Sequence, residues 1–150
     1  MISKSNCEQF NGHQLEPTPW YRVTQEQINQ FADCTLDHQS VHVDPESARA
    51  TSFGSTIAHG FLTLSMLSHF LSVSKLTVEN YRIGINYGFD KVRFVTPVKV
   101  DSNIRALFKI LKIDNDAPDR LRFKTEVTIE IEGSDRPALI ADWLTLVIVT

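Results

Sequence analysis

A carboxylate and an imidazole stand five residues apart, at Asp37 and His42, within the polar stretch Thr35–His42. On a helix they would face directions about 140° apart, so they converge only if the stretch is a loop, which its polar composition favours. An imidazole with an ordinary pKa of about 6.5 beside a carboxylate is suited to acid–base chemistry on water. A structural interpretation is also open, in which Asp37 caps a turn and His42 is a hydrogen-bonded loop histidine.

Gly60 is a second candidate, because glycine within a helix costs about 1 kcal/mol relative to alanine. It falls near the start of the helix that we predict over Thr56–Ser72. Backbone N–H groups there lack partners within the helix and lie at the positive end of its dipole. A ligand carbonyl could approach such an N–H where no side chain intervenes, as in an oxyanion site. Close packing of the helix against a sheet would require the same glycine.

Other polar residues interrupt the apolar sequence around this glycine. Ser65 and Ser68 are expected to hydrogen-bond to a backbone carbonyl one turn earlier, as serines within helices usually do. His59 either faces a pocket or hydrogen-bonds within the core, and we favour the core. Cys34, next to the polar stretch, is expected to be a small buried residue rather than a nucleophile.

The composition excludes several classes of function. A net charge of −3 over 150 residues gives no basic field for nucleic acid. The N-terminus lacks the apolar core of a signal peptide. The most apolar segment, Thr56–Ser72, is too short and too interrupted to span a bilayer, so no membrane association is expected. Cys7 and Cys34 form neither a metal-type spacing nor a disulfide framework, so we expect a cytoplasmic protein.

The length predicts one domain over residues 1–150, in which residues 1–16 are either a short helix or a loose segment. The N-terminal half is mainly helical by its periodicity. Thr24 is typical of an N-cap, with Gln27 as its capping-box partner, and Asp44-Pro45 is typical of another helix start. The predicted elements are a strand over Trp20–Val23, helices over 25–34, 45–50 and Thr56–Ser72, and a turn over Thr51–Ser55.

Apolar residues alternate with polar ones after Ser74, which predicts strands in the C-terminal half. A change of phase near Asp90 indicates a bulge. The last strand is apolar on both faces, which is typical of an inner strand or an interface. The predicted strands run over Ile83–Val95, Val98–Ile113, Leu121–Ile131 and Leu139–Val149.

Helices grouped before strands indicate an α+β fold with an antiparallel sheet. We expect about five strands wrapped around the long helix at Thr56–Ser72, because that helix is apolar on most faces and a curled sheet would bury it. Thr56 is a candidate N-cap for this helix. Such a sheet has an exposed edge strand and an open end, which favours a homodimer that extends the sheet.

Taken together, these residues resemble the MaoC-like hydratase/dehydratase family of hot-dog folds, which includes the (R)-specific enoyl-CoA hydratases. The family motif has a small residue, then Asp-x-Asn-Pro-x-His, a stretch like Asp-Pro, and an apolar run ending in His-Gly before the central helix. This chain has Asp37, His42, Asp44-Pro45 and Ile57–Gly60 in that order. The string looks closest to the nodulation protein N branch, and the resemblance covers Trp20–Val149.

The resemblance implies roles for particular residues. Asp37 and His42 would hold and activate a water that adds to the double bond of an enoyl thioester. Gly60 would offer its N–H to the thioester carbonyl, and Ser68 would support the Asp–His site. The substrate would be an acyl-CoA or acyl-carrier thioester bound along the subunit boundary of a homodimer, with no metal or redox cofactor.

Two departures from the family motif bear on these expectations. Gln39-Ser40 stands where Asn-Pro is usual, and Leu36 stands where a small residue is usual. Gln39 can still hydrogen-bond, but its longer side chain would reshape the water site. Losing the proline also removes a preset backbone angle from the loop.

The resemblance therefore predicts a lyase that hydrates a 2-enoyl thioester, or dehydrates a 3-hydroxyacyl thioester, with (R) stereochemistry. Two alternatives remain open from the residues. A thioesterase would need a carboxylate placed to activate water at the carbonyl carbon rather than at C3. A non-catalytic acyl-CoA-binding protein would retain the loop without turnover, and Gln39-Ser40 motivates that alternative.

Overall fold

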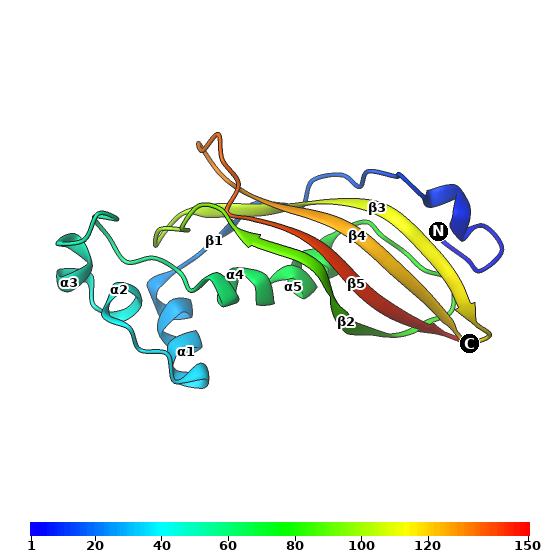
Figure 1. Ribbon diagram of the computed structural model, residues 1–150, viewed down its shortest axis with the longest axis horizontal. Helices are drawn as coiled ribbons and strands as arrows, with labels where there is room; N and C mark the ends of the chain where they lie inside the picture. The colour runs from blue at the N-terminus through cyan, green and yellow to red at the C-terminus, as the bar shows by residue number, and fades with distance from the viewer.

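The computed structural model describes residues 1–115 and 117–150. Its five strands form one antiparallel sheet in the order β1-β3-β4-β5-β2. The sheet curls over two consecutive helices, α4 and α5, on its concave side (Figure 1). The strands are β1 (Tyr21–Arg22), β2 (Tyr81–Phe94), β3 (Asn103–Ala117), β4 (Arg120–Ile131) and β5 (Leu139–Val149).

The alternating pattern of the C-terminal half forms the core, as predicted. Its inward side chains on β3 and β4 are almost fully buried, and they include Ile104, Phe108, Leu121 and Ile129. β5 lies between β4 and β2, which explains why it is apolar on both faces. The bulge expected near Asp90 is present, because the register of β2 against β5 shifts between Phe89 and Lys91.

The central helix is shorter than predicted and is interrupted. It consists of α4 (Gly60–Ser65) and α5 (Leu67–Val73), joined at Met66. The prediction that it begins at Thr56 is wrong, because residues 56–58 are extended. Ala58 N–H donates to the carbonyl of Val98 at 2.7 Å, and Val100 N–H donates to the carbonyl of Thr56 at 2.9 Å. This pairing with a distant segment outweighs the local tendency toward a helix.

The helix is buried on one side only. Leu62, Met66, Leu67 and Phe70 face the sheet and are at most 6% exposed. The opposite side carries Phe61, which is 67% exposed. The edge strand β2 is exposed along most of its length and carries large apolar side chains: Tyr81, Ile83, Ile85, Tyr87, Phe89 and Phe94. A single chain therefore leaves much of its apolar surface uncovered.

Three further helices gather at one end of the sheet, beside the start of α4 (Figure 1). They are α1 (Gln25–Thr35), α2 (Ser40–Val43) and α3 (Pro45–Arg49). Two of the three predicted N-caps are present, since Thr24 accepts from Gln27 N–H at 3.2 Å and Asp44 accepts from the backbone N–H groups of α3, whereas Thr56 does not cap α4, whose N-cap position is His59. The Gln27 side chain does not complete the capping box by bonding back to Thr24. Its amide instead donates to the sulfur of Met66 at 3.7 Å.

The N-terminal segment contains a short helical element, η1 (Cys7–Phe10). Ile2 is 1% exposed and its N–H donates to the carbonyl of Thr77, so the start of the chain packs against the rest of the molecule. Within the described part of the chain, the helices are all too short or too polar to cross a membrane.

Candidate active site

The polar stretch after α1 is partly helical. Leu36 ends α1 in the left-handed conformation, with φ 62°, and turns the chain away from the helix. Asp37 follows in the loop, whereas His42 lies on α2, so the expectation of a loop throughout is only partly correct. The turn still brings the predicted pair together. One side-chain ligand atom of each of Asp37, His42 and His59 lies within 4.8 Å of the others.

His42 has a fixed orientation. Its Nδ1 lies 2.7 Å from the backbone carbonyl oxygen of Ile57, which can only accept, so Nδ1 carries the proton. In the neutral ring, the other nitrogen, Nε2, then has the lone pair that can accept a proton. His42 is only 8% exposed and lines a cavity of about 190 Å³ that Gly60 also lines.

Asp37 is held in its ionised form by its neighbours. Partial burial is the largest single influence on its pKa and raises it. The side-chain and backbone hydrogen bonds from Gln39, with the nearby charges of His59 and His42, outweigh burial, so the pKa lies below the ordinary 3.8. The Gln39 amide donates to Asp37 Oδ1 at 3.2 Å. Gln39, which departs from the family motif, therefore still supports the carboxylate.

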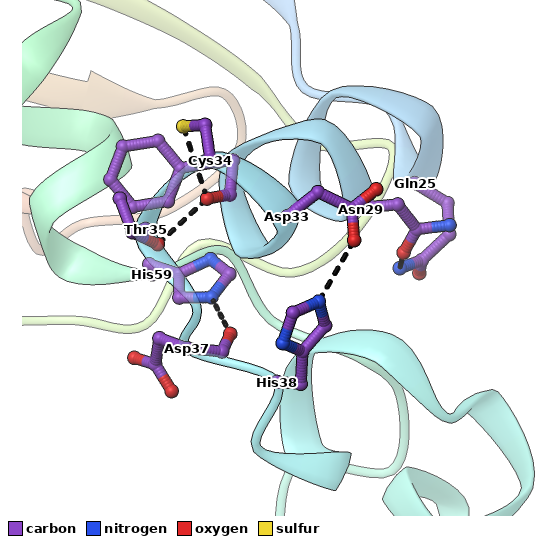
Figure 2. Close-up of polar contacts among 9 residues, drawn as sticks. Gln25, Asn29, Asp33, Cys34, Thr35, Asp37, His38 and His59 are labelled. Carbon is purple, nitrogen blue, oxygen red and sulfur yellow. Dashed lines mark hydrogen bonds and ion pairs between the residues drawn. The ribbon is translucent and has the colours of Figure 1, made fainter.

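His59 is buried between Asp37 and His42, in agreement with the expectation that it hydrogen-bonds within the core. Its Nε2 donates to the backbone carbonyl of Asp37 at 2.9 Å, and Figure 2 shows the ring directed at that carbonyl rather than at the carboxylate. The ring stacks on His42 with centroids 3.8 Å apart and planes 24° apart. Phe31 packs against it at 5.0 Å. His59 thus contacts both residues of the predicted catalytic pair.

Two imidazoles and a carboxylate are also a metal-binding set, but their arrangement is unfavourable for one ion. A metal bonds an imidazole nitrogen in the plane of its ring. The rings of His42 and His59 are stacked, so their planes run nearly side by side. The hydrogen bonds to backbone carbonyls use His42 Nδ1 and His59 Nε2, so His42 Nε2 and His59 Nδ1 are the nitrogens left for an ion. The expectation that the site holds no metal stays a prediction.

Gly60 is the first residue of α4, where a backbone N–H has no partner within the helix. A Cβ at this position would lie 2.9 Å from the ring of Phe94, so glycine is needed for packing. The same residue lines the cavity with His42. Both interpretations made from the sequence, close packing and an accessible N–H, are compatible with this position.

Ser68 lies elsewhere. It is exposed on α5 and lines a separate cavity of about 500 Å³ with Leu71, Ile85 and Trp143, whereas the cavity at His42 does not include it among its described lining residues. A direct contact with the Asp37–His42 pair is therefore not observed, and its supporting role stays a prediction. Cys34, expected to be buried, is exposed.

Gln25 and Thr56, to which the sequence analysis gave no role in the site, are connected to His42 by hydrogen bonds. The Gln25 side chain donates from Nε2 to the backbone carbonyl of His42 at 2.8 Å. Its Oε1 accepts from the hydroxyl of Thr56 at 2.5 Å. Neither residue has a local signal for this contact, because the partners lie 17 and 31 positions apart in the chain.

Comparison with known families decides the relationship. The family model described as "MaoC like domain" matches residues 7–132. The chain belongs to the MaoC-like family. The predicted hot-dog fold is confirmed by its curled five-stranded sheet and central helix, and by MaoC-like structures of the same fold. The (R)-hydratase from A. caviae involved in PHA biosynthesis superposes with a TM-score of 0.74 at 23% identity, covering 90% of this chain and 94% of that one.

Two curated relatives of this MaoC-like protein are similar over most of their length. The 3-hydroxyacyl-thioester dehydratase Z of Mycobacterium tuberculosis is 43% identical over 131 residues, which is 87% of this chain and 86% of the relative. Nodulation protein N of Rhizobium leguminosarum bv. viciae is 44% identical over 137 residues, which is 91% of this chain and 85% of the relative. The expected likeness to the nodulation protein N branch is confirmed.

Proposed function

We propose that this MaoC-like protein is a lyase that hydrates a 2-enoyl thioester, or dehydrates the corresponding 3-hydroxyacyl thioester, with (R) stereochemistry. The observation that carries the proposal is the convergence of the Asp37 carboxylate and the His42 imidazole within 4.8 Å of each other, beside a cavity that Gly60 also lines. The similarity to a 3-hydroxyacyl-thioester dehydratase supports the reaction class.

His42 acts as the base in this reaction. Its Nε2 lone pair takes a proton from a water as the water oxygen bonds to C3 of the enoyl group. The electron pair of the double bond moves toward the thioester, where an enolate oxygen develops. The proton that His42 has taken then passes to C2 as the enolate collapses, and Asp37, which stays ionised and orients the water, helps to deliver it, so the addition is complete. Dehydration follows the same steps in reverse.

Gly60 stabilises the enolate. Its N–H has no partner within α4 and can donate to the thioester oxygen, where negative charge develops. Loss of one such donor typically costs a factor of about 10²–10³ in kcat. The reaction needs no metal or redox cofactor, because each step is a proton transfer or an addition that these groups serve.

The acyl chain extends along the central helix. The cavity of about 500 Å³ beside α5 is lined mainly by apolar side chains, including Leu71, Ile85 and Trp143. Ser68, which lies eight residues after Gly60, is at its edge. At 1.5 Å per residue this is about 12 Å along the axis, a distance that an acyl chain bound beside both helices would span. The thiol carrier is CoA or an acyl-carrier protein.

The protein acts as a homodimer in the cytoplasm. The edge strand β2 carries unpaired backbone groups and apolar side chains such as Ile83 and Tyr87, which are 52% and 60% exposed. Pairing of two β2 strands would satisfy those groups and cover the exposed side of α4 and α5. The two cysteines, Cys7 and Cys34, are both free, as suits a reducing compartment.

Hydration of crotonyl-CoA and of longer 2-enoyl-CoA substrates tests the proposal in the wild type and in Asp37→Asn and His42→Gln. We expect an active wild type and a large loss of kcat in both variants. If the wild type is active and both variants keep its rate, the assignment of the site is wrong. Release of free thiol from saturated acyl-CoA would instead indicate a thioesterase, and tight binding without product would indicate a binding module.

A further inference from the structure

His42 lies on a helix that cannot fix its own position. α2 has only four residues, Ser40–Val43, and helices shorter than about 12 residues are marginal on their own. The placement of the ring therefore depends on contacts with other segments. One is the pair of hydrogen bonds with Ile57, whose N–H donates to Val41 at 3.1 Å and whose carbonyl accepts from His42 Nδ1.

Gln25 provides a second attachment, to the backbone carbonyl of His42 itself. It is the first residue of α1, whose start is fixed by the Thr24 cap. Its Nε2 donates to the carbonyl of His42 at 2.8 Å, and its Oε1 accepts from the Thr56 hydroxyl. Thr56 is 1% exposed and directly precedes Ile57. One amide side chain thus connects the backbone of the histidine to the residue beside that histidine's own acceptor.

We propose that Gln25 and Thr56 are positioning residues that hold His42 in its reactive orientation. The inference rests on the proposed function, which gives His42 its role as base. By fixing α2 and residues 56–57 relative to each other, the pair keeps Nδ1 on the Ile57 carbonyl and Nε2 free. Among the described residues that line the cavity at His42, neither Gln25 nor Thr56 is included, so their effect passes through His42.

Three substitutions test separately the hydrogen bond from Gln25 to the His42 carbonyl and the one from Thr56 to Gln25. Gln25→Glu keeps an oxygen for the Thr56 hydroxyl but places a second oxygen, which cannot donate, against the His42 carbonyl. Thr56→Val keeps the shape and removes the hydroxyl, whereas Thr56→Ser retains it. Gln30→Ala is the matched control, because Gln30 lies on the same helix, is exposed and bonds to Glu26 at 3.3 Å.

The readouts are kcat and KM for enoyl-CoA hydration, thermal unfolding, and ¹⁵N NMR of the histidine side chains, which reports the tautomer of each ring. We expect Gln25→Glu and Thr56→Val to lower kcat by about 10-fold or more with KM little changed, since a shift of about 1 Å in a catalytic group can cost about 10²-fold. His42 should show a pure Nδ1–H tautomer in the wild type and a mixture in these variants. Thr56→Ser and Gln30→Ala should match the wild type.

The double variant Gln25→Glu/Thr56→Val should lose little more than either single variant, because both act through one connection. Fully additive losses, or unchanged kcat and tautomer in folded single variants, would overturn the inference. If Thr56→Val does not fold, Gln25→Glu decides alone. A wild type without hydratase activity would contradict the proposed function. The His42 tautomer in the variants would still decide whether Gln25 and Thr56 position the ring.

Discussion

The ring of His59 lies against the ring of His42, with centroids 3.8 Å apart. His59 Nε2 also donates to the backbone carbonyl of Asp37 at 2.9 Å. One imidazole therefore packs on the proposed base and holds the loop that carries the proposed carboxylate.

Substituting His59 should separate its two contacts. His59→Phe keeps an aromatic ring against His42 but loses the hydrogen bond to Asp37, and we expect kcat to fall by about 10-fold as the loop shifts. His59→Gln keeps an amide donor for that carbonyl, so its loss should be smaller. Steady-state kinetics check this order. His38→Gln, an exposed histidine that bonds to Asp33, is the control and should retain full activity.

Gly60→Ala should lower the stability of the fold, whatever its effect on catalysis. The added Cβ would lie 2.9 Å from the Phe94 ring, and overpacking typically costs about 1–3 kcal/mol of stability. Chemical denaturation of Gly60→Ala and of Gly60→Ala/Phe94→Ala measures this cost. The double variant should recover stability lost to the clash. If its kcat recovers equally, a Cβ at position 60 does not block the approach of the thioester oxygen to the N–H, and the glycine itself is required for packing alone.

Leu36→Gly should stabilise the protein. Leu36 adopts φ 62°, a conformation that costs a residue with a side chain about 1–2 kcal/mol, and its side chain is 81% exposed, so little packing is lost. Glycine adopts that angle readily, although it gains freedom in the unfolded state. We expect a net gain of about 0.5–1 kcal/mol in the free energy of unfolding. Leu36→Ala, which keeps the strain, should show no such gain.

Asp44→Asn should remove part of the acid sensitivity of the fold. Hydrogen bonds from the Ser47 side chain and backbone lower the pKa of Asp44 below its ordinary 3.8. Its ionised form therefore stabilises the folded state above about pH 3.8, and this contribution is lost as the pH falls through the folded-state pKa. Asparagine still caps α3 but does not titrate.

Urea unfolding at pH 7 and at several values below pH 4 tests this expectation for Asp44. The stability of the wild type should decline more steeply than that of Asp44→Asn through the acid range. Asp44→Ala, which lacks any cap, should be less stable than both at neutral pH. Parallel acid profiles for the wild type and Asp44→Asn would show that this carboxylate does not contribute.

Charge placed on the edge strand should prevent association. Ile83→Lys puts an ammonium group on β2, where the side chain is 52% exposed in the single chain. Light scattering coupled to size exclusion should report a dimer for the wild type and a monomer for this variant. Ser52→Lys, on an exposed turn, should stay dimeric. A monomeric wild type would contradict the proposed homodimer.

The elements that the sequence predicted well are those with local signals. The Thr24 and Asp44 caps depend on hydrogen bonds to residues two or three positions away, and both are present. The strands follow from alternation, and the bulge at Asp90 follows from a change of phase within one strand. Each of these features is decided by neighbouring residues, so a single sequence contains the information.

The features that were missed depend on distant partners. The central helix begins at Gly60 rather than Thr56, because residues 56–58 pair with the segment around Val98. The contacts of His59 with Asp37 and of Gln25 with Thr56 join residues 22 and 31 positions apart. The Asp37–His42 pair was predicted mainly through a resemblance, since its spacing alone left a structural interpretation open.

The bare edge of β2 has a further consequence for how this protein behaves on dilution. If two copies share that edge, the folded state gains free energy from association, and its melting temperature should rise with protein concentration. Newly made chains would pass through a monomeric stage in which a long apolar strand is open to any other extended chain. Dilute preparations should therefore be the most prone to inactivation, and added ligand that binds across two copies should protect them.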